Sequence, residues 1–271
     1  MDLATLQAFE AEIKKHVPTF KIAYKDETPW MRVLGFLATP FNQGFMTKYT
    51  TTLGQTVYFP SRAYYEGQPK ASFNVLAHEF VHMQDSVKYP GWYHLSYMLP
   101  QILSPVVLFF YAMLVPWGWA AVMALLLAVV LGCVAAQRSV AAFFLVAGTL
   151  LAGAVALSVL LTHWWAALFI GGLGLLTPLP SPGRVRWELR GYTMTLAILV
   201  WTYGPPPDVV RDMVARHFYG PDYFYMSWSR AQTLATLDAA IVCAQDGSLQ
   251  KTDSYSIVYA FLEQHRALRG M

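Results

Sequence analysis

The stretch NVLAHEFVHMQDSVKYP, residues 74–90, contains one H-E-x-x-H motif, formed by His78, Glu79 and His82. Residues four positions apart lie on the same face of a helix, so this spacing presents both imidazoles to one metal ion. Glu79 stands beside them, where its carboxylate is placed to take a proton from a zinc-bound water. The motif therefore predicts a zinc site on a helix.

The surroundings of the motif bear on this interpretation. The apolar residues 75–77 and the apolar positions within the motif predict a buried helix with one polar face. A charged glutamate on such a helix is costly to bury without a partner, and a metal ion would supply one. The alternative is that the two histidines are ordinary core or interfacial groups.

The composition narrows the class of protein. The chain has 271 residues, of which 56% are hydrophobic and 13% charged. The net charge of +3 is small and the basic residues are scattered, which argues against a nucleic-acid partner. Cys133 and Cys243 are far apart, so we expect neither a disulfide framework nor a cysteine zinc site.

The N-terminal part predicts a small mixed domain. Residues 3–17 have apolar residues near helical spacing (Leu3, Leu6, Ile13 and Val17), and residues 20–25 alternate like a strand. A short helix is expected before Pro40, followed by a hairpin within residues 45–60. The helix that carries the motif is expected to begin near Ser72, as its N-cap.

The apolar residues 95–180 favour a membrane block. Their only Lys, Arg, Asp or Glu is Arg138, and a bilayer accommodates such a stretch better than a soluble core does. Breaks in the pattern divide it into about four spans, at residues 95–115, 118–136, 140–161 and 166–180. Two or three spans remain an alternative, because the fourth is shorter than the usual ~20 residues.

Charges flanking these spans predict the topology. With four spans, the basic residues lie on one side and the tryptophans of the turns on the other. The sequence thus predicts a multi-pass integral membrane protein in a lipid bilayer, with both soluble parts in the cytoplasm. We expect three parts: residues 1–94, a transmembrane part at 95–180, and a helical part at 181–271. Helices are expected at 184–201, 207–217, 229–244 and 254–268.

A catalytic zinc site needs a third ligand. A metzincin would have glycine and histidine at positions 85 and 88, where this chain has Asp85 and Lys88. Asp85 lies about 10 Å along the helix from His78, too far to share its metal, and is either a supporting or a solvent-facing residue. His94 is a weaker alternative ligand.

Glu188 is the best candidate for the third ligand, because it is the first acid after Asp85. Gly191, three positions later, would let this helix approach the histidine helix closely. Tyr192 shares a helix face with Glu188 and is a candidate donor to a developing oxyanion. The alternatives are that Glu188 pairs with a neighbouring arginine, and that Tyr192 is an ordinary tyrosine near a membrane.

With these residues in place, the chain resembles the gluzincin superfamily of zinc metallopeptidases, whose H-E-x-x-H is followed by a distant glutamate on a second helix. Residues 50–60 resemble the edge strand that holds an extended peptide in minimal zincins. Spans between the two metal-binding helices resemble the layout of HtpX-type membrane peptidases, although those have spans before the motif and usually Ala-Asp where this chain has Gly191-Tyr192.

The resemblance implies an α+β fold, in which a minimal zincin-like domain (a small sheet plus the active-site helices) is interrupted by the transmembrane block. It implies a zinc-dependent metalloendopeptidase: His78, His82 and Glu188 bind Zn²⁺, and Glu79 and Tyr192 act in catalysis. The partner is a peptide or protein substrate, at or in the membrane. The alternatives are a metal-binding membrane protein without proteolysis, or a zincin-like scaffold or sensor. A transporter is disfavoured, because the spans contain no acidic residue that could relay an ion.

Overall fold

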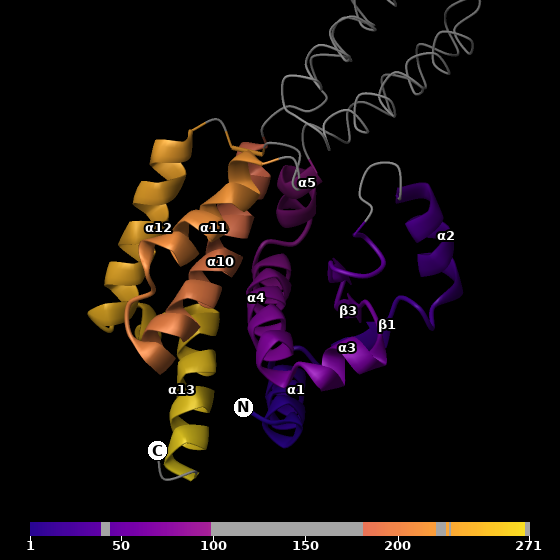
Figure 1. Ribbon diagram of the computed structural model, residues 1–271, viewed down its shortest axis with the longest axis horizontal. Coiled ribbons are helices and arrows are strands. Elements are labelled where there is room, and N and C mark those ends of the chain that lie inside the picture. Colours follow the sequence, from indigo (N-terminus) through magenta and orange to yellow (C-terminus); the bar gives the residue numbers. More distant parts are fainter. Residues whose placement is uncertain (39–43, 99–180, 221–225, 228, 269–271) are drawn as a thin grey trace, which may run out of the picture.

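The computed structural model describes residues 1–38, 44–98, 181–220, 226–227 and 229–268. These residues are mostly helical, with one small three-stranded sheet. Helices α4 (Pro69–Lys88) and α10 (Pro182–Tyr203) pack against each other at the centre of the molecule (Figure 1). The sheet lies on one side of α4, and the C-terminal helices lie beside α10 on the other (Figure 1). The two central helices therefore connect the sheet on one side to the C-terminal helices on the other.

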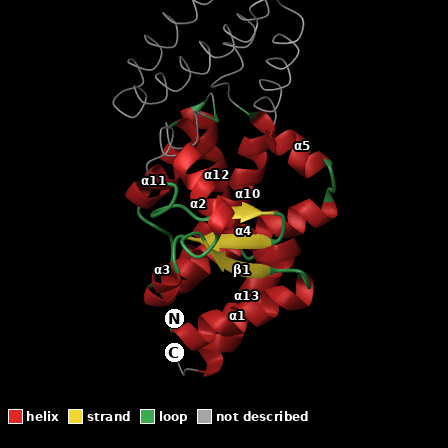
Figure 2. Cartoon of the chain, turned by 90° about the vertical axis from the view of Figure 1, so that its right-hand side faces the viewer, coloured by secondary structure: helices red, strands yellow, loops and turns green. Residues whose placement is uncertain are grey.

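The sheet has the strand order β1-β3-β2, seen across the front of the molecule in Figure 2. Strand β1 (Lys21–Tyr24) pairs in parallel with β3 (Thr56–Phe59), and β2 (Thr51–Leu53) pairs antiparallel with β3. Gly54 turns between β2 and β3 with a φ of 61°, a conformation that glycine adopts without steric cost. The strand and hairpin predictions are confirmed, and β2 forms one edge of the sheet.

The core packs helix α1 (Leu3–His16) against α4 and α13 (Asp253–Leu268). Its aromatic centre is formed by Phe9, Phe73 and Phe261, whose ring centroids lie 4.5 to 6.0 Å apart. The helix predicted at residues 3–17 is confirmed. Phe9 was missing from its predicted apolar set, yet it is fully buried.

Helices α2 (Pro29–Ala38), α11 (Asp208–Tyr219) and α12 (Arg230–Gln245) are close to their predicted positions. Helices α3 (Arg62–Gly67) and α5 (Trp92–Met98) and the 3-10 helix η2 (Leu249–Lys251) were not predicted. The predicted start of α4 at Ser72 is wrong. The helix begins at Pro69, whose fixed φ suits a first helical position, and the Ser72 hydroxyl donates to the Tyr65 carbonyl at 2.9 Å.

The predicted membrane block must be corrected. Among the described residues, no helix is both long and apolar enough to cross a bilayer. The two longest helices, α4 and α10, carry four charged residues each. Charged side chains are costly within a transmembrane helix, so neither helix is suited to span a membrane. This finding contradicts the fold class with about four spans and the location as a multi-pass integral membrane protein. The spans predicted within residues 99–180 lie outside the described residues, and residues 95–98 belong to the short helix α5.

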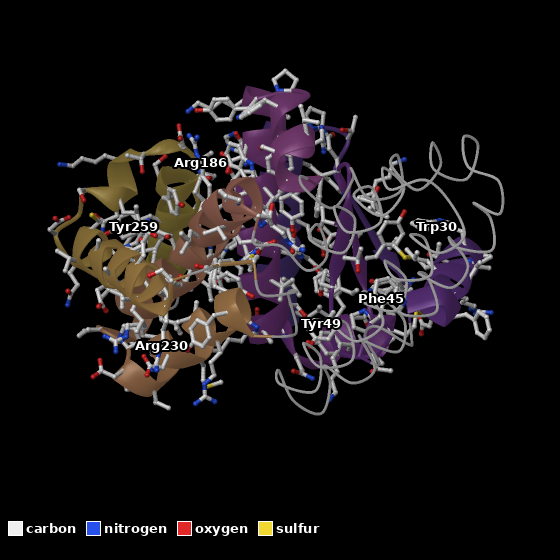
Figure 3. The ribbon with its side chains drawn as sticks, turned by 90° about the horizontal axis from the view of Figure 1, so that it is seen from above. Trp30, Phe45, Tyr49, Arg186, Arg230 and Tyr259 are labelled. Carbon is white, nitrogen blue, oxygen red and sulfur yellow. The ribbon has the colours of Figure 1, made fainter. Side chains whose placement is uncertain are left out.

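Lys25 is a fully buried cation that holds the segment before β2 in place. Its Nζ donates to the carbonyls of Phe45 at 2.6 Å and Tyr49 at 2.8 Å, and lies 3.9 Å from the centre of the Phe45 ring. Phe45 and Tyr49 lie on the same side of the molecule as α2 (Figure 3). Burial lowers the pKa of Lys25 to about 8, because desolvation penalises its charged form.

Replacing Lys25 with methionine is expected to destabilise the protein by about 2 to 3 kcal/mol, because two carbonyls lose their donor. The stability difference from the wild type should widen as the pH rises from about 8 towards 10.5. In that window the unfolded lysine still binds a proton that the folded one has lost, so folding gains with pH. Denaturant titrations across the window measure this, with the exposed Lys21→Met as the control. A difference that narrows with pH would contradict the role of Lys25.

Candidate metal centre

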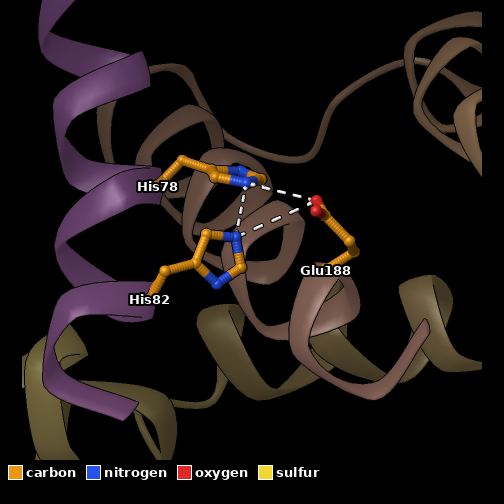
Figure 4. Close-up of side chains that lie close together, drawn as sticks. All are labelled: His78, His82 and Glu188. Atoms are coloured by element: carbon orange, nitrogen blue, oxygen red, sulfur yellow. Dashed lines mark hydrogen bonds and ion pairs between the residues drawn. The ribbon is translucent and has the colours of Figure 1, made fainter. Parts of the chain in front are cut away.

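Three predicted ligand residues converge between α4 and α10 (Figure 4). The Nε2 atoms of His78 and His82 are 3.0 Å apart, and Oε2 of Glu188 lies 3.5 Å from the first and 3.9 Å from the second. All three ligand atoms lie within 4.8 Å of one another. His78, His82 and Glu188 are therefore placed to hold a metal ion.

The donor set fits a metal of the zinc kind. Ligand atoms about 2.0 to 2.2 Å from a tetrahedral ion are separated from each other by roughly 3.4 Å, and the three observed separations bracket that value. Two carboxylates, Glu188 and the neighbouring Glu79, lie beside the two imidazoles. A dication at their centre would offset this negative charge, which is otherwise costly to bury.

Electrostatics couple the three ligands. Burial opposes the charged form of His78, but the hydrogen bond to Glu188 and the nearby Glu79 carboxylate outweigh it and raise its pKa. Burial lowers the pKa of His82 to about 3, with a further contribution from His78. Although burial opposes ionisation of Glu188, its histidine neighbours lower its pKa to about 2. The cluster thus favours an ionised Glu188 and one positive charge next to it, which a metal ion would supply in place of the proton.

The Glu188 carboxylate is held by Tyr97, a residue that no sequence pattern indicated. Tyr97, on α5, donates a hydrogen bond from its hydroxyl to Oε1 of Glu188, which leaves Oε2 facing the histidines. A hydrogen bond also connects helix α5 to α10, since Trp187 Nε1 donates to Ser96 Oγ at 2.9 Å. A tyrosine 91 residues away from its partner gives no signal in sequence spacing. Only the packing of α5 against α10 brings the two together.

Gly191 and Tyr192 surround the His78 ring from α10. A Cβ atom on Gly191 would lie 2.6 Å from both Cε1 and Nε2 of His78, so only glycine permits this approach. The prediction that Gly191 brings the two helices together is confirmed. Tyr192 places its ring edge-on against His78, with centroids 4.8 Å apart. Its ring therefore lies beside the metal centre, where it also stacks on the ring of His217 with centroids 5.4 Å apart.

Glu79 lies one residue after the first histidine and is partly buried. Burial raises the pKa of its carboxyl, and His78 partly offsets this. The side chain of Thr52, on the edge strand β2, also lies close enough to lower the pKa, although its hydroxyl has no hydrogen bond of good geometry. The motif glutamate is thus next to the sheet edge, with a pKa shifted in the direction that a general base needs.

Asp85 supports the site instead of facing solvent. Its side chain is 1% exposed, and Arg190 Nε, two residues after Glu188, donates to Oδ2 of Asp85 at 2.8 Å. Asp253, on α13, lies 3.6 Å from the same arginine. His94, the weaker candidate ligand, is exposed and does not belong to the cluster. The Asp85–Arg190 pair therefore joins the two metal-binding helices close to the ligands.

Replacing Asp85 with asparagine is expected to destabilise the protein by about 1 to 3 kcal/mol, since the half-buried Arg190 loses the charged, buried acceptor of its hydrogen bond. Asp253→Asn provides the control, because Asp253 contacts the same arginine but is 45% exposed and should cost under about 1 kcal/mol. Denaturant titrations of both variants measure the difference. Equal losses would mean that burial of the pair is unimportant.

Comparisons with protein-family models, curated proteins and solved structures found no match to this chain. The function is therefore argued from the geometry and chemistry of the site.

Proposed function

We propose that this chain is a zinc-dependent metallopeptidase of the gluzincin type. One observation carries the proposal: both histidines of the H-E-x-x-H motif meet a distant glutamate, with all three ligand atoms within 4.8 Å. The glutamate of the motif lies next to the cluster. Two imidazoles and one carboxylate are a ligand set that catalytic zinc sites use.

The number of ligands supports a catalytic zinc site over a structural one. Structural zinc sites have four protein ligands, whereas catalytic sites have three and leave one position to water or substrate. Within the described part of the chain, the cluster has three members. The His78 side chain is 13% exposed and Glu188 5% exposed, so the centre is most accessible on the side of His78 and Glu79.

In the proposed reaction, a water molecule adds to the carbonyl carbon of a peptide bond. A zinc ion, when bound, would polarise this carbonyl and make the water more acidic. Glu79 accepts a proton from the attacking water and passes it to the leaving nitrogen as the C–N bond breaks. The products are a carboxylate and an amine, so the atoms balance. Tyr192 is the proposed hydrogen-bond donor to the oxyanion, because its ring lies against His78.

The substrate is proposed to be an extended peptide that pairs with β2. This strand is at the edge of the sheet, and Thr52 at its centre lies beside Glu79. An added strand would form main-chain hydrogen bonds along the edge and bring its peptide bonds past the carboxylate.

The test is hydrolysis of an unfolded protein substrate by the purified chain. A zinc chelator is expected to abolish cleavage, and added zinc, but not magnesium, should restore it, because Mg²⁺ prefers six oxygen ligands. Full activity after complete zinc removal would contradict the proposal. Bound zinc without hydrolysis of any peptide would favour a metal-binding scaffold or sensor instead.

A further inference from the structure

A second concave site lies at the far end of the two central helices. It has a volume of about 570 Å³, within the usual range of small-molecule pockets. Its lining comes from the start of α1, the start of α4, and the ends of α10 and α13, which meet at the lower end of the molecule in Figure 1. None of the three metal ligands lines it, so it is separate from the metal centre.

The interior of this cavity is apolar. Phe73 and Ile198 line it but are only 1% and 4% exposed, so the surface open to a ligand comes from its other apolar residues. Leu262 from α13 and Trp201 from α10 complete this surface. A ligand that buries hydrocarbon here would gain roughly 25 cal/mol for each Å² of apolar surface removed from water.

The polar side chains that line the cavity include cations but no acid among the described residues. Lys70 Nζ lies 4.4 Å from the centre of the Tyr203 ring. Arg266 donates to the Trp201 carbonyl at 2.6 Å and to Glu263 at 2.9 Å. The Glu263 carboxylate offsets the charge of this guanidinium, so the exposed Lys70 ammonium supplies the main positive charge at the cavity.

We infer that this cavity binds a small apolar carboxylate, its hydrocarbon part against Trp201 and Leu262 and its anionic group at Lys70. An apolar lining with an exposed cation matches that chemistry. Such a carboxylate has two sources, an alkyl carboxylic acid or the C-terminal residue of a hydrophobic peptide. The site does not depend on the proposed peptidase activity.

The test is isothermal titration of the full chain with decanoate and with acetyl-Leu-Leu-Leu carrying a free carboxylate. Decanol and the amidated peptide are the uncharged counterparts. With about twelve non-hydrogen atoms, decanoate is expected to bind with a Kd of about 2 mM or below. Saturable binding of decanoate alone indicates the alkyl source, and binding of the peptide acid indicates the C-terminal source. Both outcomes support an apolar-carboxylate site.

Variants then locate the ligand. Thr202→Trp, at an exposed position on the cavity wall, should fill the space and remove binding. Lys70→Gln should weaken it about threefold to fivefold, the range expected for an exposed ion pair, while the exposed Lys251→Gln should leave it unchanged. These substitutions are at the surface, so folding is not at risk. Absence of saturable binding by either acid, equal binding of the uncharged counterparts, or unchanged binding in Thr202→Trp would overturn the inference.

Discussion

Glu79→Gln is expected to lower peptide hydrolysis by at least about 100-fold while zinc remains bound. The carboxylate is next to the cluster but is not one of its three ligands. Glutamine has the same shape and cannot accept the proton of the attacking water. Because burial raises the pKa of Glu79, its carboxylate is a stronger base than an exposed glutamate, and the substitution removes it. Initial rates and metal analysis on the same preparation measure both effects.

Glu66→Gln is the matched control, because Glu66 is an exposed glutamate on α3. It should retain wild-type rates and zinc content. If Glu79→Gln were as active as this control, the proposed proton transfer would be wrong even with zinc in place. If Glu79→Gln lost its zinc as well, Glu79 would be a ligand and the assignment of the three ligands would need revision.

Gly191→Ala is expected to weaken zinc binding by about 10-fold to 100-fold, the range seen when residues that orient ligands are changed. The new methyl carbon would lie 2.6 Å from Nε2 of His78, the atom assigned to the metal. Backbone and ring cannot both stay in place at that distance, so the imidazole must move. Competition with a chromophoric zinc chelator measures the affinity.

Gly67→Ala provides the comparison for this second prediction, since a Cβ atom on Gly67 would meet no atom within 4 Å. Its zinc affinity should equal that of the wild type. Circular dichroism of both variants separates a local effect on His78 from loss of folding. A folded Gly191→Ala with unchanged affinity would contradict the close approach of α10 to the metal centre.

Local sequence signals predicted most elements of the described part. Alternation indicated β1, β-branched and aromatic residues on both sides of Gly54 indicated the hairpin, and helical spacing indicated α1. The start of α4 was misplaced because Ser72 resembles an N-cap, whereas its hydroxyl bonds to the chain before the helix. Hydropathy also led to the membrane prediction, which the described helices contradict.

The candidate site was partly predictable for a physical reason. His78 and His82 are four residues apart on one helix, so helix geometry alone places them together. Glu188 was reached by requiring a third ligand, and the structure places it beside both histidines. Tyr97 and the Asp85–Arg190 pair were not foreseen, because they depend on how α5 and α10 pack. Contacts between helices distant in the chain leave no local pattern.

The central claim is that His78, His82 and Glu188 hold zinc, and metal analysis tests it most directly. The chain, purified without chelators, is expected to contain about one zinc per molecule, and zinc-edge X-ray absorption should show two imidazole nitrogens and oxygen ligands. Glu188→Ala should lose most of this zinc. A chain without zinc, or a Glu188→Ala variant that keeps its zinc with an unchanged absorption spectrum, would contradict the account.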